Sequence, residues 1–224
     1  CRKDNQTKLL QLSGTPFNLI TNYSAEDMYT WDYTMEQIAK AMWYKEHGGD
    51  HNPYAELPEM RIYTFDIAKQ FSNFVDAEKA FNFREFFRVW SGEIERDGRP
   101  VPGDSAVGRF VHEKDVRNFL SLITRSDENS NYPFAKDKWR NYFRHTLWMV
   151  PGVAAAKALS ALLSEHPVFS IFNIANVAGD GDEEEESKEA LRKVEEAIGK
   201  NPEDSYSITL SCGRLTTGVS VKPW

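Results

Sequence analysis

The sequence predicts an α/β fold built on parallel strands. Short apolar runs at 145–150, 168–177 and 207–210 alternate with helical patterns at 154–164 and 187–198. Strands that alternate with helices in this way are typical of βαβ units and a parallel sheet. Because ligands bind such sheets beyond the carboxyl ends of the strands, the loops that follow these runs are the first candidates for a functional site.

Two more strand candidates lie near the N-terminus. Leu9–Leu12 is a short apolar run before the turn residues of Ser13–Phe17, and Arg61–Ile67 alternates and is rich in strand formers. Between them, apolar residues recur at helical spacing, so we expect a helix over about 25–45. Its apolar stripe comprises Met28, Trp31, Met35, Ile38 and Met42.

The middle of the chain favours helices. Phe83, Phe86, Phe87 and Trp90 fall on one face of a helix, and 112–124 shows the same kind of spacing. We interpret the aromatic stripe as core, with a partner-docking face as the alternative.

Composition limits the class of protein. The 224 residues can bury the core of one or two domains. No apolar run reaches the roughly 18 residues of a membrane-spanning helix. The start at Cys1 lacks both a Met and an apolar leader, so we expect an internal start. With Cys212 as the second of two cysteines, we expect a reducing, cytoplasmic location without a disulfide framework.

The net charge of −7 does not exclude nucleic-acid binding, because the acidic residues are clustered. Asp180, Asp182 and 183–186 form one block, which we interpret as a solvated loop or helix start. Basic residues gather around 84–99 and 136–144, and such local patches govern phosphate contacts more than total charge does.

Two loops of small polar residues follow strand candidates. They are Ser13–Phe17, which reads SGTPF, and Gly213–Gly218, which reads GRLTTG. Taken alone, the first is explained by a tight loop and the second by an ordinary strand-to-helix connection. The second also suits a nucleic-acid phosphate, because backbone N–H groups and threonine hydroxyls line it and Arg214 adds charge. Neither is a P-loop, since no G-x-x-x-x-G-K-[ST] motif occurs in the chain.

In this order and spacing, the segments resemble superfamily 2 helicases and translocases, and more narrowly the helicase-like subunit of type III restriction enzymes and their relatives. Motif III of that family resembles QLSGTPF at 11–17, and the last strand of its first RecA-like domain resembles RIYTFDI at 61–67. The opening of the second RecA-like domain, with motif IV, resembles HTLWMVPGVAAAKALSALLSEHP at 145–167. Motif V resembles ITLSCGRLTTGVSVKPW at 208–224.

The resemblance implies a partial tandem of RecA-like parallel sheets. Residues 1–70 would be the C-terminal part of the first RecA-like domain, 71–135 an inserted helical segment, and 136–224 most of the second domain. The parent protein would move along duplex DNA, or unwind it, in the restriction of foreign DNA. Its cofactors would be ATP and Mg²⁺, and its partners DNA and a methyltransferase subunit, with no membrane.

The resemblance also assigns roles to single residues. Motif III, with Ser13, Gly14 and Thr15, would couple ATP hydrolysis to movement of the two domains. In motif V, Thr216 and Thr217 would lie near a nucleic-acid phosphate. Two further motif V positions would lie near the nucleotide, namely Gly218 and Ser220. Many relatives carry an acid at the position of Ser220, so a direct ribose contact is not expected there.

Motifs I, II and VI are missing from the chain. They supply the phosphate cradle, the metal ligands and the arginine finger, and phosphoryl transfer needs all three together. The segment alone should therefore not hydrolyse ATP or hold a cofactor tightly. A nuclease domain, if the parent has one, would lie outside this stretch.

Three weaker patterns have ordinary explanations. Around 138–144, aromatic and basic residues interleave, which suits stacking on bases. An aromatic helical stripe is more often core, so from this region we keep only Arg140 and Arg144 as DNA-contact candidates. The segment from His47 to His51 is expected to be a surface loop rather than a metal site. Cys212 is expected to be a small buried residue rather than a catalytic thiol.

Two other functions stay open at this point. One is a stand-alone, degenerate helicase-like module that binds DNA or a partner without ATP turnover. The other is an unrelated α/β hydrolase of phosphate esters whose loops imitate the helicase motifs.

Overall fold

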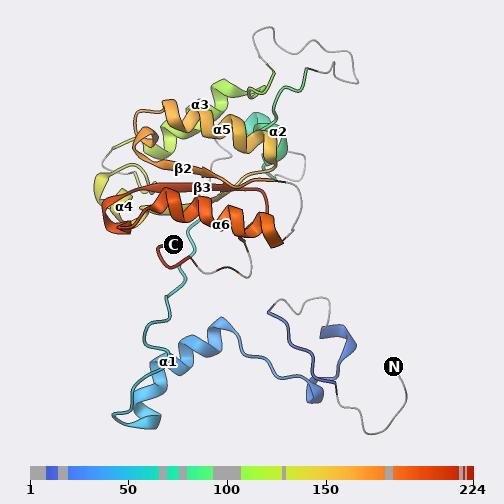
Figure 1. The fold of residues 1–224 in the computed structure, drawn as a ribbon, viewed down its shortest axis with the longest axis vertical. Coiled ribbons are helices and arrows are strands. Elements are labelled where there is room, and N and C mark those ends of the chain that lie inside the picture. The colour runs from blue at the N-terminus through green and yellow to red at the C-terminus, as the bar shows by residue number, and fades with distance from the viewer. Residues whose placement is uncertain are drawn as a thin grey trace. The chain divides into compact units, whose positions relative to one another are not determined.

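The computed structural model describes residues 9–14, 20–65, 70–75, 80–92, 107–127, 130–179, 184–216, 219 and 221–224. The chain divides into two compact units, Cys1–Phe65 and Asp66–Trp224. The second unit contains a three-stranded, all-parallel sheet with helices packed on it (Figure 1). The predicted α/β class is therefore confirmed, and the arrangement is consistent with a partial RecA-like fold.

The sheet has the strand order β1-β3-β2, which puts the last strand in the centre. The strands are β1 (His145–Met149), β2 (Asn173–Asn176) and β3 (Ser207–Ser211), and the first residues of β1 and β2 both lie opposite Ser207. All three lie within the predicted ranges or one residue beyond them. Strand β2 is shorter than the predicted run 168–177, because Phe169–Ile171 forms a 3₁₀ turn before it.

Two helices connect the strands and cover opposite faces of the sheet. Helix α5 (Val153–Glu165) leads from β1 to β2, and α6 (Glu184–Ile198) leads from β2 back to β3. The first connection passes over β3 and the second returns in the opposite direction. Since parallel crossovers are right-handed, this reversal sends the two helices to opposite faces, as Figure 1 shows.

Every residue of β3 is buried, as expected for a strand with both faces covered, and successive side chains point to opposite faces of the sheet. Ile208 and Leu210 belong to the larger core, which also contains Leu159 and Leu163 of α5. On the other face, α6 packs against short side chains. That smaller cluster contains Ala175, Val177, Ala190, Val194, Ile198 and Leu215.

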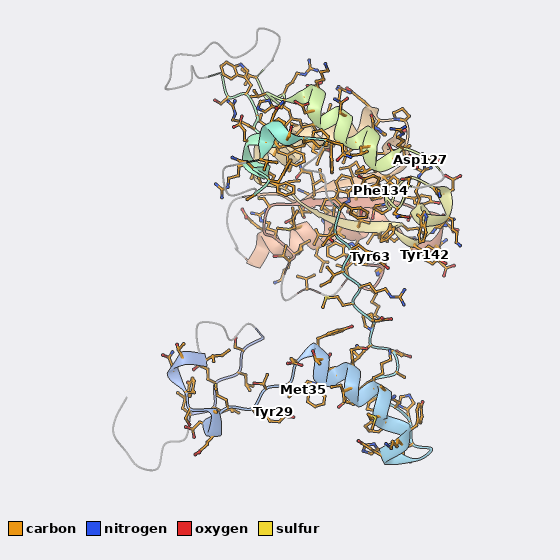
Figure 2. All side chains as sticks on the ribbon, turned by 180° about the vertical axis from the view of Figure 1, so that it is seen from behind. Tyr29, Met35, Tyr63, Asp127, Phe134 and Tyr142 are labelled. Atoms are coloured by element: carbon orange, nitrogen blue, oxygen red, sulfur yellow. The ribbon has the colours of Figure 1, made fainter. Side chains whose placement is uncertain are left out.

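The middle segment shares the larger core. Residues 71–135 contain a 3₁₀ turn (Ser72–Phe74), α2 (Phe83–Phe86) and α3 (Glu113–Thr124). Helix α4 (Asp137–Tyr142) follows this segment. Buried aromatic side chains here join the core beneath α5, where Phe134 packs edge-to-face on Phe169 and Phe172. The others pack edge-to-face among themselves; these are Phe71, Phe74, Phe86, Phe87 and Phe110. Figure 2 marks Phe134 inside this unit.

The helical stripe predicted from Phe83 to Trp90 is correct only for its first turn. After Phe86 the chain leaves the helix, and Val89 pairs with Phe110 in an antiparallel bridge. Phe86 and Phe87 are buried as predicted, whereas Phe83 is exposed. The helix predicted at 112–124 is confirmed as α3.

The first unit differs most from the prediction. Its helix α1 (Tyr33–His47) begins eight residues later than expected, because Ala25–Asp27 forms only a 3₁₀ turn and Asp32 caps the helix by accepting a 2.9 Å hydrogen bond from the Met35 N–H. A second 3₁₀ turn spans Ile20–Asn22. The strands predicted at 9–12 and 61–67 are wrong for the described residues, which form no strand at 9–12 or 61–65.

The physical reason is that a strand requires a neighbour whose backbone groups complete its hydrogen bonds. No described residue of the first unit supplies such a neighbour.

In the second unit, a last 3₁₀ turn at Pro202–Asp204 precedes β3. Among the residues that the structure describes, no helix is long and apolar enough to cross a membrane.

Shortening Leu210 should destabilise the second unit, because this side chain has no exposed surface in the central strand. We expect Leu210→Ala to lower the free energy of unfolding by about 3 kcal/mol. Ile171→Ala is the matched control, since Ile171 is 55% exposed, and it should cost less than about 1 kcal/mol. Urea unfolding followed by circular dichroism measures both, and equal losses would contradict the described core.

Candidate nucleic-acid interface

Three loops leave the carboxyl edge of the sheet, and we call them the carboxyl-edge loops. They are 150–152 after β1, 177–179 after β2 and 211–216, which begins at the last residue of β3. Hydrogen bonds extend the sheet into the first two, because the Val150 N–H donates to the Ser211 carbonyl (2.8 Å) and the Val177 N–H to the Leu210 carbonyl (3.0 Å). The third loop thus starts between two loops that lead to helices on opposite faces, which is where open α/β sheets bind ligands.

Ser211 shapes the turn after β3. Its buried hydroxyl donates to the Arg214 carbonyl (2.6 Å) and accepts from the Gly213 N–H (3.1 Å). Thr216 closes the turn again, since its hydroxyl donates to the Gly213 carbonyl (2.7 Å). Gly213 has a φ of 153°, a value that side chains disfavour, so glycine suits this position.

Leu215 anchors the loop to the protein. Its side chain is buried in the cluster beneath α6, although its backbone has a φ of 61°, in the left-handed region that non-glycine residues rarely adopt. Such a conformation costs of order 1 kcal/mol and persists only where the surroundings enforce it. The insertion of Leu215 fixes its neighbours Arg214 and Thr216 at the carboxyl edge.

The Arg214 side chain lies across the loop that follows β2. It forms an ion pair with Glu186 in the first turn of α6, and only 13% of it is exposed. A Cβ on Gly179 would meet the guanidinium group of Arg214, so a side chain there would displace the flexible end of Arg214 from this position. The structure therefore adds Glu186 and Gly179 to the site. The sequence analysis did not identify either residue, although a glycine two positions after a predicted strand was a usable signal.

Some predicted site residues lie elsewhere or outside the described part. Thr15, Thr217, Gly218 and Ser220 fall outside the described residues. Ser13 and Gly14 are exposed in the first unit, and a Cβ on Gly14 would meet nothing within 4 Å. Of the predicted site residues, the structure brings Arg214 and Thr216 together at one edge.

Arg140 and Arg144 lie at the opposite, amino edge of the same sheet. Arg140 Nε donates to the Phe134 carbonyl (2.8 Å) and Nη1 pairs with Asp137 (2.6 Å), which ties this side chain to the start of α4. The Arg144 guanidinium lies 4.5 Å from the centre of the Tyr206 ring, a cation–π distance. The two ends of a five-residue strand are separated by roughly 13 Å. The four predicted DNA-contact residues described therefore form two separate groups.

Two weaker candidates have structural neighbours. The His47 ring stacks on Trp43 with centroids 3.9 Å apart, at the end of α1. Cys212 is half-buried, and its thiol faces the Gly179 carbonyl at 3.8 Å. In the described parts of the chain, no three His, Cys, Asp or Glu residues gather in a way that would hold a metal ion.

The carboxyl-edge loops offer the guanidinium of Arg214, the hydroxyl of Thr216 and backbone groups. Groups of these kinds bind anions such as phosphate.

Comparison with known proteins finds a relative that matches nearly the whole chain. The chain is 30% identical, over 235 residues, to a Mycoplasma pneumoniae protein named as a putative type II restriction enzyme and methyltransferase, C-terminus. The match covers 97% of this chain, and the chain spans 31% of that relative's length. No protein-family model and no solved structure matches the chain. The similarity supports a relation to restriction enzymes and by itself says nothing of helicase activity.

Removing the Ser211 hydroxyl should loosen the turn that presents Arg214. We expect Ser211→Ala to cost about 1–2 kcal/mol in unfolding free energy, because it removes both a donor and an acceptor from a buried turn. Ser164→Ala is the control, since the exposed Ser164 hydroxyl bonds only within α5 among the contacts described, and it should cost under about 0.5 kcal/mol. If the two variants unfold alike, Ser211 does not hold the turn.

Proposed function

We propose that this chain is the DNA-contacting part of a restriction–modification enzyme whose parent protein is an ATP-driven helicase or translocase. The observation that carries the proposal is the loop after the central strand, where Arg214 and Thr216 are fixed at the carboxyl edge. Its sequence resembles motif V, and the segments resembling motifs III, IV and V follow in that order. The similarity to a named restriction enzyme and methyltransferase supports the same biological setting.

The carboxyl-edge loops would bind the sugar–phosphate backbone of DNA rather than read bases. Hydroxyl, guanidinium and backbone N–H groups make contacts of this kind, and these fix the position of a protein without selecting a sequence. A motor that moves along DNA needs contacts that are independent of sequence. Thr216, and Thr217 beyond the described residues, would meet the phosphate, while Arg214 supplies positive charge.

Glu186 would compete with DNA for the Arg214 guanidinium. In the structure the guanidinium is paired with this carboxylate and is mostly covered. A DNA phosphate that reaches the loop would compete with the Glu186 carboxylate for Arg214. Because the Glu186 side chain is 45% exposed, its carboxylate can return to water when a phosphate takes its place beside Arg214.

ATP and Mg²⁺ are proposed as cofactors of the parent rather than of this chain. The chain contains no P-loop motif. Gly218 and Ser220, outside the described residues, are its proposed contribution beside the nucleotide. In the parent, ATP would supply the free energy for movement, and Ser13, Gly14 and Thr15 would couple hydrolysis to the two domains.

The class of the restriction system is a further proposal. The motif resemblance points to a type III-like helicase subunit, whereas the relative's name refers to a type II enzyme that also carries a methyltransferase. A methyltransferase, as a domain or a separate subunit, fits both descriptions and is the proposed partner.

Changing Arg214 should weaken DNA binding. We expect Arg214→Gln to raise the Kd for a short duplex by about tenfold at low salt, since a charge-assisted contact is lost. Arg192→Gln is the control, because Arg192 lies exposed on α6 with the acids Glu189 and Glu196, and its Kd should stay within about twofold. Fluorescence anisotropy across a salt series measures both.

Glu186→Gln separates the loss of a contact from damage to the fold. It keeps the shape of the side chain while it frees Arg214, so we expect DNA to bind roughly threefold more tightly than to the unchanged chain. Weaker binding by Glu186→Gln, or equal effects of Arg214→Gln and Arg192→Gln, would contradict a phosphate contact at this loop.

ATP hydrolysis should require polypeptide beyond this chain. With duplex DNA and Mg²⁺, the 224-residue chain should release phosphate at the rate of a protein-free blank, because the resemblance leaves motifs I, II and VI outside it. The product of the whole reading frame should release phosphate faster when DNA is added. Turnover by the chain alone would contradict the assignment of its segments, and a whole product without ATPase would favour a module that only binds DNA.

A further inference from the structure

The amino edge of the sheet carries a helix, α4, with two exposed aromatic rings. Trp139 and Tyr142 are three residues apart, so their rings lie on the same side of the helix, with centroids 6.2 Å apart. Trp139 is 40% exposed and Tyr142 is 72% exposed. Figure 2 labels Tyr142 at the margin of the second unit. These two side chains are therefore not the core residues that an aromatic helical stripe predicts.

Contacts with the start of β3 keep α4 in place. The Tyr206 hydroxyl donates to Asn141 Oδ1 (2.7 Å), and the Ser207 N–H donates to the Arg144 carbonyl (2.7 Å). Since Ser207 is fully buried in the central strand, these bonds tie the end of the helix to the rigid part of the unit. The two rings are thus displayed on a fixed support, which reduces the ordering cost when a flat ligand stacks on them.

The surroundings of the two rings are positively charged. Residues 136–144 contain four basic residues and one acidic residue, although the whole chain has a net charge of −7. Lys138 Nζ lies 6.0 Å from the centre of the Trp139 ring, and the Arg144 guanidinium lies over Tyr206. A ligand that covers this side of α4 should therefore combine flat apolar faces with negative charge.

Acidic side chains limit where such a ligand can lie. On α4 itself, Asp137 is paired with Arg140 (2.6 Å). The 3₁₀ turn before β3 carries Glu203 and Asp204, which are both exposed at the same amino edge. An anionic chain should therefore follow α4 and avoid this turn.

We propose that α4 and its basic flanks bind an unpaired strand of DNA. One base stacks on Trp139 and another on Tyr142, while Lys138 and Arg144 lie near the phosphates. Aromatic side chains stack on any base, and neighbouring cations neutralise the backbone, so this contact does not select a sequence. A duplex does not offer the same surface, because its base faces are already covered by their neighbours in the stack.

The proposal deepens the proposed function, on which it rests for the choice of DNA over RNA. The carboxyl-edge loops and α4 lie at opposite edges of the sheet, so the two contacts can be tested separately. A duplex at one edge and an unpaired strand at the other are the two forms of DNA that an unwinding enzyme handles. An enzyme that only translocates along duplex DNA does not need the second contact, so the site on α4 favours unwinding.

Fluorescence anisotropy of the 224-residue chain with a labelled oligothymidylate of about 12 nucleotides tests the stacking. Tyr142→Phe keeps the ring, so its Kd should stay within about twofold of the unchanged chain. Tyr142→Leu keeps an apolar side chain but removes the ring, and it should raise the Kd at least about fivefold. Tyr44→Leu is the matched control, because Tyr44 is a helical tyrosine that is 60% exposed on α1, and it should leave the Kd unchanged.

The salt dependence of the same binding tests the basic flanks. Lys138→Gln should reduce the slope of log Kd against log salt concentration by about 0.7, the value of one phosphate contact with a single strand. Lys157→Gln is the control, since Lys157 is exposed on α5, and it should leave the slope unchanged.

Equal Kd values for Tyr142→Phe and Tyr142→Leu would overturn the stacking. Duplex binding that Tyr142→Leu weakens as much as single-strand binding would overturn the preference for an unpaired strand. Tighter binding of an oligouridylate of the same length would overturn the choice of DNA.

Arg214→Gln distinguishes this proposal from the proposed function, because it should weaken duplex binding and leave oligothymidylate binding unchanged. If Arg214→Gln does not affect duplex binding while Tyr142→Leu weakens single-strand binding, the proposed function fails and the site on α4 stands. The reverse pattern overturns the site on α4 alone.

Discussion

The burial of β3 between two helical layers is the constraint on which the second unit depends. Its Ile208 and Leu210 side chains close the core beneath α5, and its opposite face closes the smaller core beneath α6. Because both neighbouring strands pair with it, β3 also fixes their register. The first residue of the loop after β3 is fixed by this buried strand. A binding loop held in this way keeps its contact groups in place before the ligand arrives.

The loop itself combines small residues with one strained anchor. Ser211 and Gly213 make the turn, while Leu215 adopts a left-handed backbone in order to reach the core. Strain of this kind is maintained only where packing repays it, and it is common where a protein positions side chains for a ligand. Here the residues on either side of the anchor are Arg214 and Thr216. The local structure and the proposed DNA contact therefore point to the same few residues.

Much of the second unit was predictable from the sequence because its signals are local. The strands at 145–149 and 207–211 and the helices α3, α5 and α6 follow from hydrophobic spacing and turn residues within each segment. Residues Phe169–Ile171 were predicted as part of a strand but form a 3₁₀ turn, since a short apolar run fits either structure. The stripe at Phe83–Trp90 failed beyond Phe86 because its aromatic residues pack against partners distant in sequence, such as Phe110.

The missed features depend on contacts between distant residues. Glu186 and Arg214 are 28 positions apart, and the acidic block gave no sign that one of its members would cover a predicted binding residue. The separation of Arg140 and Arg144 from the loop follows only from the sheet, which sends them to its amino edge. In the first unit, residues 61–65 have the composition of a strand but form none with the described residues, and a strand is a property of a pair rather than of a segment.

We expect DNA to meet the protein at the carboxyl edge of this sheet. Photo-crosslinking can locate the contact, with the whole reading-frame product bound to a duplex that carries photoreactive groups on its phosphates, and mass spectrometry to map the crosslinked peptides. Crosslinks should appear in the peptide that contains residues 211–216. Crosslinks confined to the amino edge, around Arg140 and Arg144, or none within residues 136–224, would contradict it.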